Sequence, residues 1–283
     1  MKNDIIYRLT TGLHERALES GGFCHNIGMN ERVDATAWAV LALDLIEGET
    51  ELVKAGRNRL AAQQSSDGRI ALTDETPGVY WPTPIGLLAW NHDSLFYNQR
   101  ALAVDFLLCH GGITLSEQPL FMEHNTKLQG WPWVEGTYSW VEPTSMVLMA
   151  LESQGEINHA RYQEGICMLI DRMLPEGGWN YGNRKVFDSR LKPLPEYTGM
   201  ALCALRHVDD KMQLNKSLNY LETAYHNLNT PLSLSWTIRG LSEYGLKPKN
   251  SVDRIGRCLE LQSKYGPFDT SLLAQLAIAL VST

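Results

Sequence analysis

Three carboxylates in this chain each begin an uncharged helical run: Asp34, Glu142 and Glu196. Carboxyl groups gathered in a site that excludes water can act as general acid and base, because burial raises the pKa of an acid and keeps its proton available. Asp269 precedes a similar run, and Asp is a favoured helix N-cap, so capping is the alternative reading. Glu is a poor N-cap, which leaves a catalytic function open for Glu142 and Glu196.

Aromatic residues in loops lead to the same helix starts: Trp131, Trp133, Trp140, Trp179 and Tyr181. Aromatic faces can surround a cation in a closed site, so these side chains are candidates for substrate binding. The alternative is that they plug the joints between helices. His25, which follows Cys24 and precedes Asp34, is a further candidate, either for substrate binding and proton relay or as a satisfied polar residue near a helix start.

The helical runs recur six times along the chain. They cover residues 34–43, 81–90, 142–151, 196–205, 232–241 and 269–278, and their third positions are Thr36, Thr83, Thr144, Thr198, Leu234 and Ser271. Each run is apolar on all sides for about three turns, and such a helix must be buried on every side. We therefore expect six inner helices.

Segments between these runs are apolar on one stripe only, as in residues 162–173 and 214–221, and predict outer helices with one wet face. Glycine followed by an aromatic or aliphatic residue precedes most inner runs, as at Gly177-Gly178-Trp179. Glycine at this place ends the outer helix, and the next side chain plugs the joint. The expected fold is all-α, an α/α toroid of about six helical hairpins in a single domain over residues 1–283. Its inner helices run parallel, so the carboxylates meet at one mouth.

Composition excludes several classes of function. A net charge of -7 leaves no basic stripe for a nucleic acid. The N-terminal residues lack the apolar segment of a signal peptide, no window is long and apolar enough to span a membrane, and five scattered cysteines without paired spacing are typical of reduced thiols. These features predict a cytoplasmic protein. The cations Lys185, Arg190 and Lys192 could meet a diphosphate or could belong to a solvated loop.

The Gln-x-x-x-Gly-x-aromatic element resembles a repeat motif of a known superfamily. It spans Gln64 to Ile70, with Ile in place of the aromatic residue, and Gln262 to Phe268. The chain is similar along nearly its whole length to the prenyltransferase and squalene-oxidase repeat superfamily, which includes squalene/hopene cyclases and class II terpene cyclases. Their Asp-x-Asp-Asp motif precedes Thr-Ala; here the matching stretch retains only its middle acid, Asp34, beside Arg32 and Ala35.

The resemblance implies a terpene-cyclase-like isomerase or lyase that cyclises or isomerises an isoprenoid in an aromatic-lined cavity. Asp34 would donate the proton, while Glu142 and Glu196 would tune it or act as base. We expect a small apolar partner, peripheral membrane contact as an option, no resident metal, and no cofactor other than Mg²⁺ if the substrate is a diphosphate. Two alternatives use the same residues: a carbohydrate-active α/α barrel with paired carboxylates and stacking tryptophans, and a protein that binds a lipid without turnover.

Overall fold

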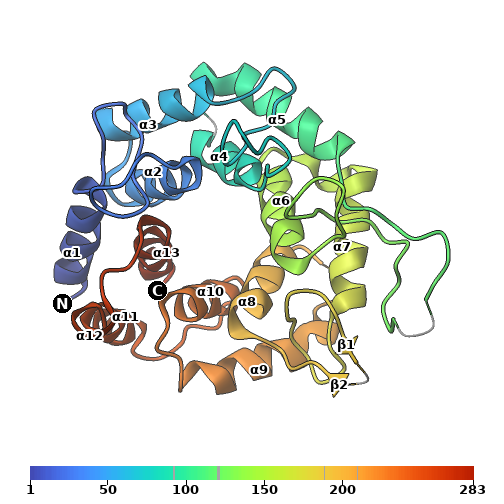
Figure 1. Ribbon diagram of the computed structural model, residues 1–283. Helices are drawn as coiled ribbons and strands as arrows, with labels where there is room; N and C mark the ends of the chain where they lie inside the picture. Colours follow the sequence, from blue (N-terminus) through green and yellow to red (C-terminus); the bar gives the residue numbers. More distant parts are fainter. Residues whose placement is uncertain (92, 120–121, 188, 209) are drawn as a thin grey trace.

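The computed structural model describes residues 1–91, 93–119, 122–187, 189–208 and 210–283, which form two concentric rings of helices (Figure 1). Each inner helix packs against the next, and the last packs against the first, which closes the ring. The inner helices are α2 (Val33–Glu47), α4 (Pro82–Trp90), α6 (Val141–Ser153), α8 (Pro195–Ala204), α10 (Pro231–Ser242) and α13 (Thr270–Val281). The predicted all-α toroid is confirmed.

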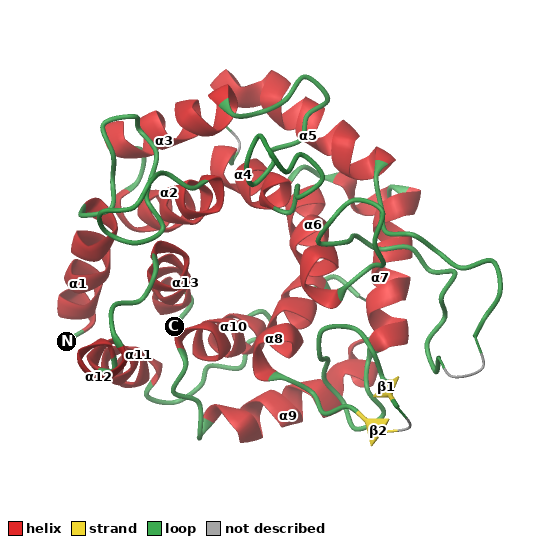
Figure 2. Ribbon diagram, viewed as in Figure 1, coloured by secondary structure: helices red, strands yellow, loops and turns green. Residues whose placement is uncertain are grey.

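The outer ring covers the joints between inner helices. It contains α1 (Lys2–His14), α3 (Glu51–Ala62), α5 (Tyr97–Cys109), α7 (Ala160–Arg172), α9 (Asn215–Tyr225) and α11 (Ser251–Glu260). Short elements complete the described chain: α12 (Gln262–Tyr265), the 3₁₀ turns η1 (Ser94–Phe96), η2 (Glu156–Asn158) and η3 (Lys211–Leu214), and the antiparallel pair β1 (Lys185–Val186) and β2 (Ser189–Arg190). Figure 2 shows long loops between α5 and α6 and between α7 and α8.

The inner helices have no polar stripe along their length, which explains why they form the inner ring, where other helices cover them on every side. In α2, every residue from Val33 to Val40 is buried, because α13 and α4 flank it and outer helices cover it from behind. The outer helix α11 instead buries one stripe, with Ile255, Cys258 and Leu259 inward. Within the described ranges, no helix is both long enough and apolar enough to cross a membrane.

A threonine near the start of four inner helices fastens the loop that precedes it. Thr83 Oγ1 accepts a hydrogen bond from the backbone N–H of Ile70 (2.9 Å) and donates one to its carbonyl (3.2 Å). The N–H bond recurs between Phe23 and Thr36, Trp131 and Thr144, and Trp179 and Thr198. All four side chains that precede these helices are fully buried. The threonine therefore holds a side chain that plugs a joint of the toroid.

The glutamines of the two Gln-x-x-x-Gly-x-aromatic elements hydrogen-bond to the backbone. Gln64 Nε2 donates to the carbonyls of Gly68 (3.0 Å) and Gln99 (2.9 Å), which ties the end of α3 to the start of α5. At the second site, Gln262 Oε1 accepts a hydrogen bond from the backbone N–H of Phe268 (2.9 Å). Each amide therefore fixes the backbone of the loop that follows its helix.

Candidate functional site

A cavity of about 220 Å³ lies among the N-terminal halves of the inner helices. Its apolar wall consists of Trp38, Trp81, Ile85, Trp133, Pro143, Met146, Met200, Trp236 and Leu272. Its polar residues are His25, Asp34, Glu142, Asp269, Ser271 and Gln275. Because all six inner helices contribute residues near their N-termini, they share one mouth, which we call the central cavity.

Two positions in each repeat supply most of the lining. Asp34, Trp81 and Glu142 occupy the first position, two residues before the threonine that fastens the loop. The second position, four residues later, contains Trp38, Ile85, Met146, Met200 and Trp236. Residues four apart lie on the same side of a helix. In α13 the corresponding pair is Ser271 and Gln275. The sequence alignment of the repeats places Ser271 at the threonine position. In the structure Ser271 takes the position of Asp34 instead, so the alignment of this repeat is wrong by two residues.

Two pairs of tryptophans form the aromatic part of the wall. The rings of Trp38 and Trp236 meet edge to face with centroids 6.2 Å apart, and those of Trp81 and Trp133 do the same at 5.7 Å. Edge-to-face contact is a favoured aromatic geometry. Sequence reasoning found only Trp133 of these four. The missed signal is that the other three stand at the first or fifth position of a repeated inner run.

Glu142 is a carboxyl group in the cavity whose pKa is shifted from its ordinary value. It is the second residue of α6, lines the central cavity and accepts no hydrogen bond from any described residue. Burial raises its pKa to about 7, and the nearby Glu196 adds to the rise. The positive end of the α6 dipole acts in the opposite direction, but loss of water outweighs it. Glu142 therefore holds its proton close to neutral pH.

Asp34 lies in the same cavity in a different electrostatic setting. Its side chain is buried, and Arg32 donates to both oxygens, Nε to Oδ1 at 2.9 Å and Nη2 to Oδ2 at 2.8 Å. Such a two-point ion pair is a strong interaction with a defined geometry. Among the described residues it is the fork of Arg32, not a backbone N–H of α2, that engages Asp34.

His25 and Asp269 face Glu142's helix from the other side of the ring. His25 Nε2 is 3.8 Å from Asp269 Oδ2, while Asp269 caps α13 by accepting from the N–H of Leu272 (3.0 Å). The expected N-cap is thus present at Asp269. The buried polar atoms His25 Nδ1, Ser271 Oγ and Gln275 Oε1 have no hydrogen-bond partner among the described residues. These three residues, with Asp34, Glu142 and Asp269, make up the polar part of the cavity lining.

Two residues predicted to bind substrate lie elsewhere. Trp131 and Trp179 are fully buried in joints between hairpins and are not among the residues that line the central cavity. Their indole N–H groups donate to backbone carbonyls, at Leu107 (2.8 Å) and Leu169 (2.6 Å). The prediction of ligand contact for these two side chains does not match their positions, because the repeat uses them as plugs.

The remaining predicted residues lie at the edge of the site. Trp140 and Tyr181 contact each other, with ring centroids 5.9 Å apart, beside a separate smaller cavity. Glu196 is close enough to raise the pKa of Glu142, and its Oε2 accepts a hydrogen bond from Ser233 Oγ (2.7 Å). Glu196 does not itself line the central cavity.

The loop cations between α7 and α8 are not part of the central cavity. Arg190 Nη1 lies 3.7 Å from Glu176 on the surface, Lys185 Nζ lies 3.9 Å from Glu123, and Lys192 is exposed. None of these three cations lines the central cavity. In the parts of the chain that the structure describes, no group of three or more His, Cys, Asp or Glu side chains is arranged to hold a metal ion.

The raised pKa of Glu142 predicts a stability that depends on pH. Between its ordinary pKa of 4.5 and its folded value of about 7, the folded state binds the extra proton, so stability falls as pH rises through this window. The full penalty above pH 7 is about 3 kcal/mol. Glu142→Gln cannot ionise, so its advantage over the parent in urea unfolding should grow by about 2 kcal/mol between pH 5 and pH 8. An advantage that does not change with pH would contradict this.

The fold is shared with enzymes of different specificity. A protein from Actinoplanes superposes with a TM-score of 0.68 at 13% identity, covering 100% of this chain and 98% of the other. The type II terpene cyclase MstE from Scytonema gives 0.62 at 13% identity, covering 99% and 96%. An alpha-amylase from Clostridium perfringens gives 0.62 at 10% identity, covering 100% and 98%. No protein-family model and no curated protein matches the sequence. At these identities the likeness establishes the toroid fold.

Proposed function

We propose that the protein is an enzyme that cyclises or isomerises an isoprenoid by proton transfer in the central cavity, with Glu142 as the proton donor. One observation carries the proposal: a carboxyl group that stays protonated near neutral pH faces a cavity walled by four tryptophans and by aliphatic side chains. The apolar wall suits a hydrocarbon chain, and aromatic faces stabilise the cation formed on protonation. The structural neighbour MstE has geranylgeranyl dihydroxybenzoate as its substrate.

The assignment of the donor differs from the resemblance-based expectation, which placed it at Asp34. Both oxygens of Asp34 accept hydrogen bonds from Arg32, so its carboxylate is already held by the guanidinium in the cavity wall. Glu142 has no such partner among the described residues. The negative charge of Glu196 also favours the neutral form of Glu142. Asp34 and Arg32 then form a fixed ion pair in the cavity wall.

His25 is the best placed residue to receive the proton at the end of the reaction. It lies across the cavity from Glu142, has Asp269 beside its Nε2, and also lines a second, open depression with Met29 and Arg32. The proton can then leave to solvent by way of this second depression.

The acidity of Glu142 restricts which class of isoprenoid it can protonate. An acid of pKa about 7 transfers a proton to oxygen more readily than to an alkene carbon. We therefore favour an isoprenoid with an epoxide: the proton from Glu142 goes to the epoxide oxygen, a C–O bond breaks, and an internal alkene forms the new C–C bond. The resulting cation loses a proton to His25, so the product is an isomer of the substrate.

A carbohydrate substrate is the second candidate, and one observation favours it. A carboxylic acid with a pKa near 7 is suited to protonating a glycosidic oxygen, and a second carboxylate, Asp34, lies in the same cavity. Tryptophans also stack on sugar rings. The aliphatic part of the wall, Ile85, Met146, Met200 and Leu272, is the reason for placing this candidate second.

Product analysis separates the two candidates. The purified protein is incubated with C15 and C20 isoprenoids, with and without a terminal epoxide, and with a panel of oligosaccharides. Isoprenoid turnover should yield products of unchanged mass in which a carbocycle and a hydroxyl group have replaced the epoxide, detected by gas chromatography and mass spectrometry. Release of reducing ends or unsaturated uronates would favour the second candidate, and absence of both reactions, with a bound lipid, would contradict an enzymatic function.

The variant Asp34→Asn tests which carboxyl group donates the proton. Because Asp34 is paired with Arg32, the substitution should lower turnover of the epoxide substrate by less than about 10-fold, as expected for a neighbouring charge rather than the general acid. Circular dichroism checks that the fold is intact. A loss of about 10³-fold or more in a folded variant would return the donor function to Asp34.

A further inference from the structure

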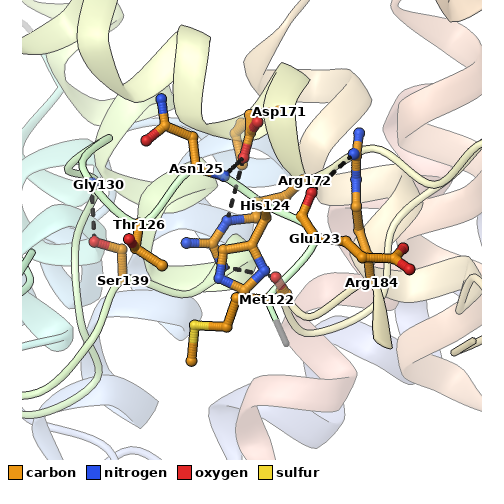
Figure 3. Close-up of polar contacts among 12 residues, drawn as sticks. Met122, Glu123, His124, Asn125, Thr126, Gly130, Ser139, Asp171, Arg172 and Arg184 are labelled. Carbon is orange, nitrogen blue, oxygen red and sulfur yellow. Dashed lines mark hydrogen bonds and ion pairs between the residues drawn. The ribbon is translucent and has the colours of Figure 1, made fainter. Parts of the chain in front are cut away.

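A second cavity of about 100 Å³, which we call the side cavity, lies outside the ring of inner helices. It is enclosed by the loop between α5 and α6, the last residue of α7 and the loop after it. Its ionisable residues are His124, Tyr138 and Arg172, and Figure 3 shows the side chains of His124 and Arg172. The central cavity and the side cavity share no lining residue.

Arg172 is buried with its positive charge only partly matched. It is 7% exposed, and Nη1 donates to the carbonyl of Gly182 (2.7 Å). Nε is buried without a hydrogen bond, 3.8 Å from Asp171 Oδ2, which already accepts from the backbone N–H of Asn125 (2.9 Å). Nη2 donates to no described residue. A buried charge with free donors is costly unless a partner satisfies it.

The charges around the side cavity favour an anion. Burial, more than any charge, lowers the pKa of Arg172, to about 10, and it remains a cation at neutral pH. Burial and the charges of Arg172 and Arg184 lower the pKa of His124 to about 4, so its ring is neutral and can donate one N–H. His124 thus contributes a donor without adding a second positive charge.

The remaining lining shows what kind of anion fits. Polar donors come from Asn183, whose side-chain amide has no hydrogen bond to any described residue, and from the Ser139 hydroxyl. Apart from Thr126, whose hydroxyl donates to Gln118, the rest of the wall is apolar or aromatic: Ile113, Met122, Leu128, Tyr138 and Trp140. A free inorganic anion would leave this apolar surface uncovered. An apolar group attached to the anion would cover it.

We propose that the side cavity binds a small organic carboxylate, which pairs with Arg172 and packs its apolar part against Leu128 and Trp140. A planar guanidinium matches a carboxylate through two parallel hydrogen bonds. Binding would also bear on the central cavity, because Trp140 is two residues before Glu142 and the N–H of Val141 donates to the carbonyl of Tyr181 (3.0 Å). The proposal stands independently of the isoprenoid reaction.

Calorimetric titration of the full chain tests it with butyrate as the probe. Butyrate should bind, while phosphate and the neutral isostere butanol should bind at least about 10-fold more weakly. Arg172→Met should lower butyrate affinity by about 10- to 100-fold. Arg184→Met is the matched control, because Arg184 donates to the carbonyls of Met173 and Glu123 and does not line the cavity. Its effect should stay within about 3-fold.

Asn183→Ala provides a second test, since this side chain makes no hydrogen bond whose loss would unfold the described structure. It should weaken butyrate by about 3- to 10-fold, whether or not Arg172→Met folds. Equal effects of Asn183→Ala and Arg184→Met would overturn the site. Phosphate binding more tightly than butyrate would overturn the ligand class, and butanol binding equally well would overturn the pairing with Arg172.

Discussion

Glu142→Gln is expected to lower turnover of an epoxide-bearing isoprenoid by about 10²- to 10⁴-fold, the contribution typical of a positioned general acid. The amide keeps the shape of the side chain but has no acidic proton to transfer. Substrate affinity should change little, because the apolar wall supplies most of the contact. In the parent protein, turnover should fall as pH rises through about 7, where Glu142 loses its proton.

Glu196→Gln is the matched control for this prediction. It removes the charge that helps to raise the pKa of Glu142 but leaves the donor in place. Turnover should fall by less than about 10-fold, and the alkaline limb of the pH profile should move to lower pH. Retention of more than a tenth of the parent activity in a folded Glu142→Gln protein would show that another group supplies the proton.

Trp131→Ala is expected to destabilise the protein by about 3 to 5 kcal/mol, the cost typical of deleting a large aromatic side chain from a core. Trp131 is fully buried, its indole N–H donates to the carbonyl of Leu107, and the Arg161 guanidinium lies 4.6 Å from its ring. Deleting the ring opens a void in the joint between hairpins and leaves that carbonyl unpaired. Urea unfolding measures the loss.

Trp133→Ala, two residues along the same loop, is the matched control. Trp133 is only partly buried, and it lines the central cavity beside Trp81. Its loss should cost about 1 to 2 kcal/mol, less than Trp131, and should instead weaken ligand binding in the central cavity. Similar stability losses for the two variants would contradict the distinction between a plug and a cavity wall.

The toroid follows from patterns that are local in the chain. A helix with no polar stripe, such as α6, must be covered on every side, and an amphipathic helix, such as α11, needs cover on one. Six alternations of these two types leave few arrangements other than concentric rings. The inner helices of such a ring run parallel, so the sequence also predicts that Asp34 and Glu142 share one mouth, as they do. The two residues were found by their position in the repeat alone.

The different positions taken by the tryptophans are decided by the folded chain and not by the sequence pattern. Trp131, Trp133 and Trp140 come from one loop, yet they lie in a joint, in the central cavity and in the side cavity, because the loop has no regular backbone repeat that would fix their directions relative to one another. Trp38 and Trp236 belong to helices that are apolar all round, so no polar stripe in the sequence marks the side that faces the cavity.

The environment of Glu142 has the same origin. Asp34 and Glu142 occupy equivalent positions, but the sequence places Arg32 two residues before Asp34, where Glu142 has Trp140, so the ion pair of Asp34 is local in the chain. Glu142 instead faces apolar side chains and Glu196. The raised pKa of Glu142 depends on loss of water and on the charge of Glu196 in the next repeat, and both exist only after the ring has closed. The repeat pattern determines which residues meet, and tertiary packing determines the pKa of Glu142.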